Sequence, residues 1–265
     1  MELEDAEMSK FVEIFDNTVS KYDGILARID HQKSMIDELI NRQETDGHIV
    51  STKYYEQLKT QEKNSIAQLE KEKAELIKKR ADWVAAGGTV GSEDWNKMTD
   101  EIEATTLAIE EGKTALIEYD NAIRQIKWDT FDLLQEQISN VSKEADFLID
   151  LMSNDKLYND NGQFTDQGMA AMGLHGQNYN THMYQADQYN AEIAEIDKLL
   201  KEDPYDQELI ARRQELVEAQ QESILAAEAE KEAIRDMVQE GIELELDALQ
   251  ERIDKYEEAL DAAKD

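Results

Sequence analysis

The sequence predicts an all-α fold, built as elongated antiparallel helical hairpins or a coiled-coil bundle. Apolar residues recur at alternating steps of three and four, which is the spacing of one face of a helix. Glu, Lys, Leu, Ala and Gln are abundant, and these residues lose little side-chain freedom in a helix. The 265 residues include a single proline, Pro204, so long stretches carry no helix breaker. One small non-helical insert, near residues 153–165, is the expected exception.

Residues 8–86 are expected to form an N-terminal helical hairpin. The first helix, about 8–45, carries a seam, by which we mean a row of side chains that faces a packing partner. This seam consists of Phe15, Thr18, Tyr22, Ile25, Ile29, Gln32, Ile36 and Leu39. Gly47 can take the left-handed conformation that ends a helix, and Ser51 or Thr52 can cap the next helix.

The second helix, about 51–86, shows weaker spacing in its first half, and a long connecting helix over residues 92–152 follows it. The seam of the second helix consists of Ile66, Leu69, Leu76 and Trp83. A glycine-rich turn ends this helix. Ser92 is a good N-cap for the connecting helix because Glu93 and Asp94 then lie near its positive end.

The connecting helix carries two seams rather than one. The first consists of Ile102, Thr105, Ile109, Leu116, Tyr119, Ile123 and Ile126. The second consists of Phe131, Leu134, Ile138, Val141, Ala145, Leu148 and Met152. The two are offset near Trp128, and such an offset rotates the apolar face of a helix. We therefore expect the packing partner to change there.

The turn insert over residues 153–165 contains Asn159–Gly162, a sequence typical of a tiny hairpin turn between two short apolar–aromatic stretches. The same residues invite a calcium interpretation. The EF-hand pattern fails, because its first and twelfth positions would be Leu157 and Gly168 rather than carboxylates. An adventitious surface ion is the alternative that stays open.

Residues 166–265 are expected to form a C-terminal helical hairpin. Thr165 caps its first helix, about 166–202. Asp203 as N-cap and Pro204 at the first helical position predict the start of the last helix. That helix runs to the end of the sequence, and its final seam consists of Leu246, Leu249, Ile253, Tyr256 and Leu260.

The charge and composition exclude several classes of partner and site. The formal net charge is −33, which disfavours binding to nucleic acid and to anionic membranes. The stretch Lys53–Arg80 is locally basic, and a salt-bridged helix face is favoured there over a binding patch. The chain has no cysteine, so disulfides, thiolate metal sites and cysteine nucleophiles are excluded. No apolar run approaches the ~20 residues that span a bilayer, so no membrane-spanning segment is expected.

The stretch Gly168–Tyr189 is the most unusual segment of the sequence, because it combines His175 and His182 with methionines and glycines. A metal site is one interpretation. Histidines seven residues apart lie ~10.5 Å apart along a helix, and the four-residue spacing of helical zinc motifs is absent. We favour a packing role, in which the imidazoles and tyrosine hydroxyls find partners on a facing helix. No metal, cofactor-binding or catalytic residue is predicted.

Motifs for catalysis are lacking in the rest of the chain. The sequence contains no nucleophile elbow, no phosphate loop and no glycine-rich dinucleotide turn. Pairs of carboxylates are frequent, but a chain so rich in Glu and Asp places such pairs on solvated helix faces by chance. The sequence therefore predicts that the protein is not an enzyme.

Several long phrases resemble the helical portion of bacteriophage tail tape-measure proteins, from long-tailed phages of Gram-positive hosts. The phrases are YDNAIRQIKWDTFDLLQEQISNVSKEADFLIDLMSNDKLYNDNGQFTDQGMAAMGLHGQNYNTHMYQADQY, WVAAGGTVGSEDWNKM and the terminal YEEALDAAKD. The resemblance covers most of residues 80–265, is clearest over 119–189 and is weak before residue 50. No catalytic residue of the family matches this chain.

The resemblance implies a ruler of phage tail length. In this family, extended helical chains occupy the tail tube, guide its polymerisation, and leave before or with the DNA. The expected partners are copies of the chain itself and tail-tube or tail-assembly proteins, and the expected location is the virion tail, after the host cytoplasm during assembly. Complete members are longer and carry apolar, membrane-active segments, so this sequence resembles a fragment of such a protein.

Two other classes of function are compatible with the residues. A bacterial coiled-coil adaptor or scaffold would bind a protein partner through an exposed helical seam. An enzyme or metal protein would be built around His175, His182 and neighbouring carboxylates.

Overall fold

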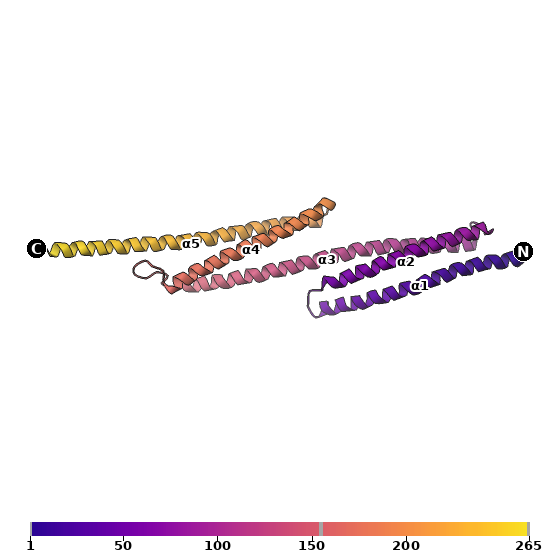
Figure 1. The fold of residues 1–265 in the computed structure, drawn as a ribbon, viewed down its shortest axis with the longest axis horizontal. Coiled ribbons are helices and arrows are strands. Elements are labelled where there is room, and N and C mark those ends of the chain that lie inside the picture. Colours follow the sequence, from indigo (N-terminus) through magenta and orange to yellow (C-terminus); the bar gives the residue numbers. More distant parts are fainter. Residues whose placement is uncertain (1, 154–155, 264–265) are drawn as a thin grey trace. The chain divides into compact units, whose positions relative to one another are not determined.

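The computed structural model describes residues 2–153 and 156–263, with side chains from residue 8 onward (Figure 1). Five helices form in this part of the chain: α1 (Glu2–Thr45), α2 (Thr52–Ala85), α3 (Glu93–Ser153), α4 (Asp166–Glu202) and α5 (Gln207–Ala262). The structure is 89% helical. Within the described ranges, β pairing is limited to one isolated antiparallel bridge between Tyr158 and Phe164. The predicted all-α fold of packed helical hairpins is confirmed.

The chain divides into two compact units, Met1–Asp132 and Leu133–Asp265. The boundary falls inside α3, so this one helix contributes to both units. In the first unit, Lys97 of α3 pairs with Asp16 of α1 at 2.8 Å, and Arg80 of α2 donates to Thr99 Oγ1 of α3 at 2.9 Å. In the second unit, the rest of α3 contacts α4, which in turn pairs with α5. The sequence prediction of a partner change near Trp128 agrees with this division.

The core of the first unit is built from side chains of three helices. One cluster joins Phe15 of α1, Leu76 and Trp83 of α2, and Met98 and Ile102 of α3, all buried. A second cluster, Ile40, Val50 and Leu58, closes the turn between α1 and α2. Both clusters bury aromatic or aliphatic side chains, whose removal from water is the main favourable term in helix pairing.

The helix ends follow the expected signals in most places. Gly47 has φ 72°, the left-handed conformation that ends α1. The Ser51 hydroxyl accepts a hydrogen bond from the Lys53 amide at 3.4 Å, and the Thr165 hydroxyl accepts one from the Gly168 amide at 3.1 Å. The predicted caps of α2 and α4 are therefore confirmed.

The start of α5 differs from the prediction. Asp203 does not cap α5, because its backbone amide donates to Leu199 O and completes the end of α4. Its side chain accepts a hydrogen bond from the Tyr205 amide, which makes a turn. Asp206 is the N-cap instead, since its carboxylate accepts bonds from the amides of Glu208 and Leu209. Pro204 therefore lies in the turn between the helices rather than in the helix.

The first predicted seam is correct as far as Ile29 and again at Ile36, which packs on the cluster of Ile40, Val50 and Leu58. Beyond Ile29, Gln32 and Leu39 are exposed, while Lys33 and Ile40 turn inward. Residues at alternating steps of three and four repeat every 3.5 residues, whereas a straight helix has 3.6 residues per turn. Over several turns such a row therefore rotates away from the inward face of a straight helix. Lys33 also has a reason to face inward, because its ammonium pairs at 2.9 Å with a carboxylate of α2, Glu62, that is buried.

The weak apolar spacing of α2 has a simple cause, because part of its inward row is polar. The buried residues of α2 are Leu58, Glu62, Ser65, Leu69, Glu72, Leu76 and Trp83. Their steps of three, four and seven make a regular seam. A search for apolar residues misses the three polar members, whereas Leu69, Leu76 and Trp83 were predicted and are buried.

The predicted second seam of α3 is correct for only some of its members. Ala145 is buried and Phe131, Ile138 and Met152 are half-buried, as predicted. Leu134, Val141 and Leu148 are exposed instead, and Gln135 and Ser142 take the other buried positions. This half of α3 turns a polar face inward because the facing side chains of α4 are themselves polar. The groove between α3 and α4 is left with an open, largely apolar volume of about 620 Å³, lined by Ile138, Val141, Gly173, Gly176, Gln177, Asn180, Thr181 and Tyr184.

The insert forms the tiny hairpin that the sequence predicts. The amide of Asn159 donates to Gln163 O at 2.8 Å, and the amide of Gly162 donates to Asn159 O at 3.0 Å. The hairpin packs on α5, where the Tyr158 hydroxyl donates to Met237 O at 2.6 Å. Gly162 has φ 78° and lies so close to α5 that a Cβ there would collide with the backbone at Glu245.

Candidate functional site

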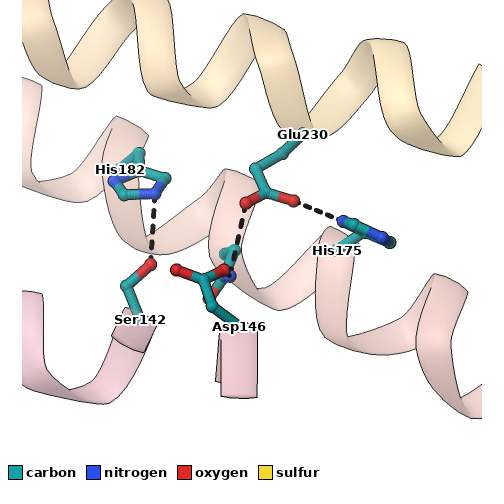
Figure 2. A network of polar contacts seen from close by, with 6 residues as sticks. Ser142, Asp146, His175, His182 and Glu230 are labelled. Atoms are coloured by element: carbon teal, nitrogen blue, oxygen red, sulfur yellow. Dashed lines mark hydrogen bonds and ion pairs between the residues drawn. The ribbon is translucent and has the colours of Figure 1, made fainter. Parts of the chain in front are cut away.

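The histidines of the unusual stretch lie in a polar layer between the helices of the second unit (Figure 2). His175 and His182 both project from α4, two turns apart. His175 Nδ1 lies 2.5 Å from Glu230 Oε2 on α5, and His182 Nε2 lies 3.1 Å from Ser142 Oγ on α3. Each imidazole thus has a partner on a facing helix, as the packing interpretation expects, and the two rings contact different helices.

Asn178 is the centre of this layer, and it is 0% exposed. Its amide nitrogen donates to Asp146 Oδ1 of α3 at 2.6 Å and lies 3.3 Å from Glu230 Oε1 of α5. One side chain of α4 therefore connects both neighbouring helices, and Glu230 also contacts His175 through its other oxygen (Figure 2). An amide donor is well suited to this place, because it satisfies two carboxylates without adding charge.

The sequence prediction missed Asn178, although its position carries a signal. It follows His175 by three residues and precedes His182 by four, so all three share one face of α4. The row continues through Gln185, whose amide donates to the backbone oxygen of Gln135 at 3.3 Å. Apolar spacing could not find this row, because its buried members include amides.

The layer continues into a polar cavity of about 350 Å³ among α3, α4 and α5. His182, Gln185 and Ser223 contribute to its lining. The side-chain amide of Gln135 also lines it, and both of its polar atoms are buried without a protein partner. A cavity of this size and polarity suits ordered water molecules that bridge such groups.

The layer offers hydrogen bonds that connect three helices. Among the described residues, no group of three or more His, Asp or Glu side chains is placed to hold a metal ion. His175 with Glu230 has the geometry of a base oriented by a carboxylate. The side chain that hydrogen-bonds this pair is the amide of Asn178, 3.3 Å from Glu230 Oε1, and an amide is not a nucleophile of the serine or cysteine type.

We expect the double substitution H175Q and H182Q to leave the metal content of the protein unchanged. Glutamine keeps a hydrogen-bonding side chain at both positions, and neither contact described above needs an ion. Protein purified without added metal should hold less than a stoichiometric amount of zinc or nickel by elemental analysis, before and after the substitutions. Stoichiometric metal in the unsubstituted protein that disappears in the variant would establish a metal site.

The basic stretch Lys53–Arg80 lies on α2 and pairs in part with α3. Lys59 forms an ion pair with Asp120. Arg80 places its guanidinium 4.6 Å from the centre of the Trp95 ring, in addition to its hydrogen bond to Thr99. These contacts agree with the predicted salt-bridged helix face.

A second buried polar feature, Glu72, lies in the first unit. Glu72 is 4% exposed on the inward row of α2. Burial is the largest cause that raises the pKa of its carboxyl, to about 7, and the carboxylates of Asp23, Glu101 and Glu75 raise this pKa further. The folded state therefore keeps Glu72 protonated at mildly acidic pH, where an ordinary glutamate is ionised, because the charged form would be desolvated beside other negative groups.

We expect the first unit to become less stable as the pH rises through about 7. The folded pKa of Glu72 lies above the ordinary value of 4.5, so its favourable contribution is complete below that ordinary value and is lost above the folded one. E72Q should remove this dependence and raise the free energy of unfolding near pH 8 by roughly 1–3 kcal/mol.

Tryptophan fluorescence measures this effect selectively, because all three tryptophans lie in the first unit. Denaturant titrations near pH 5 and pH 8 should differ less for E72Q than for the unsubstituted protein. The matched control is E56Q, at an exposed carboxylate of the same helix. Equal pH dependence in the two variants would show that Glu72 ionises in the ordinary way.

The comparisons with known proteins do not identify a family for this chain.

In the described part of the chain, no helix combines the length and apolar character needed to cross a membrane. The long helices and the polar layer are therefore the features on which a functional proposal can rest. Searches against protein-family models, curated proteins and solved structures find no match to this chain.

Proposed function

We propose that this chain is a structural segment of a phage tail tape-measure protein, which sets tail length by helical extent and templates assembly of the tail tube. The observation that supports the proposal most is the continuity of α3. This helix has 61 residues and contributes to both compact units without a break. At 1.5 Å per residue it is ~90 Å long.

A continuous helix suits a ruler because its length is fixed by the number of residues and by backbone hydrogen bonds. Each added residue lengthens the helix by ~1.5 Å, and each heptad lengthens it by ~10.5 Å. The hairpins α1–α2 and α4–α5 would support α3 on its two halves, since most of the stability of a helix in a protein comes from packing of its inward face. The role is structural and needs no catalytic residue.

The proposed partners follow from the same role. Copies of the chain would associate with one another, and tail-tube or tail-assembly proteins would surround them, in the host cytoplasm during assembly and then in the virion tail. The net charge of −33 would keep the chain from binding the DNA that later passes through the tail, because like charges repel.

An adaptor or scaffold is the second candidate, and one observation favours it. The apolar row at the end of α5 is exposed, from Leu246 to Leu260. An adaptor uses such a row to bind a partner helix, and its function would then depend on that segment alone.

Cross-linking in purified tails tests the proposal directly. Tails from a phage that encodes this chain should contain its peptides by mass spectrometry, cross-linked to the tail-tube subunit at positions spread over both units. Virions that lack these peptides, or cross-links confined to the end of α5, would favour the adaptor.

A further inference from the structure

The C-terminal part of α5 extends beyond its own hairpin (Figure 1). Packing on α5 ends near Gly241, which is buried against Tyr158, and Glu245, which adjoins Gly162 of the insert. Beyond this point every described residue of α5 is exposed except Ala248, which is half-buried. Six large apolar side chains in this segment are between 45% and 70% exposed: Ile242, Leu246, Leu249, Ile253, Tyr256 and Leu260.

These six residues form a regular coiled-coil row, which we call the α5 seam. The steps between them are four, three, four, three and four. In heptad notation, Leu246, Ile253 and Leu260 take position a, while Ile242, Leu249 and Tyr256 take position d. A row this regular on one helix leaves the complementary half of the coiled coil to be supplied by another helix.

The charges beside the α5 seam indicate which helix can supply that half. Arg252 lies at position g, and the residues three and four positions away are Ala248, Leu249, Lys255 and Tyr256. None of these is acidic, so Arg252 has no carboxylate at the spacing that allows an ion pair within one helix. Glu257 lies at position e, and Asp254 and Asp261 are at those same spacings from it. Arg252 and Glu257 are therefore placed to pair with opposite charges on another helix.

We propose that the α5 seam binds a second copy of itself, parallel and in register. In a parallel coiled coil, position g of one helix lies beside position e of the next heptad of the other helix. Arg252 of each copy then pairs with Glu257 of the other, so the symmetric complex gains two interhelical ion pairs. The six apolar residues of each copy meet their own counterparts.

The antiparallel arrangement is disfavoured by the same charges. Two antiparallel copies could also overlap over residues 242–260. In that register, g positions of one helix lie beside g positions of the other, and e positions lie beside e positions. Arg252 would then lie beside Arg252 of the second copy, and Glu243 beside Glu257. Like charges at these flanking positions oppose the pairing.

The seam spans 19 residues, or ~27 Å of rise, so the association should be weak and should depend on concentration. Repulsion between two chains of charge −33 adds to this weakness, and moderate salt should relieve it. The inference deepens the self-association part of the proposed function. Its failure would leave the ruler proposal intact, because that proposal is tested by cross-links to the tail-tube subunit and by tail length.

Single cysteines in the full chain test the orientation, since the natural sequence contains none. Y256C places the thiol at a d position, where parallel, in-register helices bring equivalent residues together. We expect mild oxidation to convert most of this variant to a covalent dimer on non-reducing gels. E258C, on the outer face of the same helix, is the matched control and should stay mostly monomeric. Equal cross-linking of the two variants, or none in Y256C, would overturn the proposal.

Charge reversal tests the specific ion pairs. Sedimentation equilibrium should show a monomer–dimer equilibrium for the unsubstituted chain. R252E should weaken it several-fold, and the double variant R252E and E257R should restore it, because the pairs re-form with exchanged signs. I253Q should weaken it by about tenfold or more through lost apolar burial, whereas L225Q, at an exposed leucine of α5 outside the seam, should not change it. A monomer at all concentrations, or a double variant weaker than R252E alone, contradicts the proposal.

Discussion

N178D should destabilise the second unit by roughly 3–5 kcal/mol near neutral pH. The substitution keeps the shape of the side chain but replaces an amide donor with a carboxylate. Asn178 is 0% exposed, so the new charge is buried, and it faces the carboxylates of Asp146 and Glu230 that the amide now satisfies. Each of the two hydrogen bonds would be replaced by repulsion between two carboxylates.

The measurement combines two probes of unfolding. Circular dichroism should show that part of the helical signal melts earlier in N178D, while tryptophan fluorescence, which reports the first unit, keeps its transition. N180D is the matched control, because Asn180 is exposed on the same helix, and it should change stability by less than about 0.5 kcal/mol. Lower pH should partly rescue N178D by neutralising carboxylates. A stable N178D variant would mean that the polar layer does not hold the three helices together.

G162A should destabilise the same unit by roughly 2–4 kcal/mol. Gly162 has φ 78°, a conformation that costs a residue with a Cβ about 1–2 kcal/mol. The added methyl group would also collide with the backbone of α5 at Glu245. The hairpin of the insert would have to move away from α5, and the contact between Tyr158 and Met237 would be lost with it.

G173A, in the same unit, should raise the stability instead of lowering it. Gly173 is helical, exposed, and has open space where a Cβ would lie. Alanine there should stabilise α4 by about 0.5–1 kcal/mol, because glycine loses more backbone freedom on folding. Thermal unfolding followed by circular dichroism should therefore move in opposite directions for the two variants. If G162A unfolded at the same temperature as the unsubstituted protein, the insert would not be fixed to α5.

Helix positions were predictable because long helices depend on local signals. Gly47, Ser51 and Thr165 act at their own sites through backbone conformation and capping, so a sequence is enough to find them. The predicted start of α5 was wrong because the N-cap of this helix depends on how the preceding helix ends. Asp203 was already used by the end of α4, and only the structure shows that Asp206 accepts the free amides of α5.

Seams were less predictable than helices, because the inward faces of this protein are often polar. Glu62 and Glu72 on α2, and Gln135 on α3, occupy buried positions that apolar spacing assigns to solvent. Such residues become interpretable only once their partners are known, as with Glu62 and Lys33. The candidate site shows the same limit: its histidines were found from their rarity, while Asn178 was found from its contacts.

The polar layer has a physical meaning for a structural protein. Buried polar contacts contribute little net free energy, but breaking one of them is costly, so they favour a single register between helices. Asn178 satisfies α3 and α5 at once, and a shift of α4 by one turn would lose both contacts. A fixed register is what a protein that measures length requires.

Tail length in deletion mutants tests the central claim, that the protein works through the length of its helices. In the parent protein, one, two or three heptads should be removed from α3 within residues 93–127, together with the facing heptads of α1 and α2, so that the inward rows stay aligned. Each heptad removes ~10.5 Å of rise. Electron microscopy of virions should show tails that shorten in proportion to the residues deleted from α3, and reinserting heptads of different sequence should restore the length. Viable phages with deletions in α3 and tails of unchanged length would contradict the account.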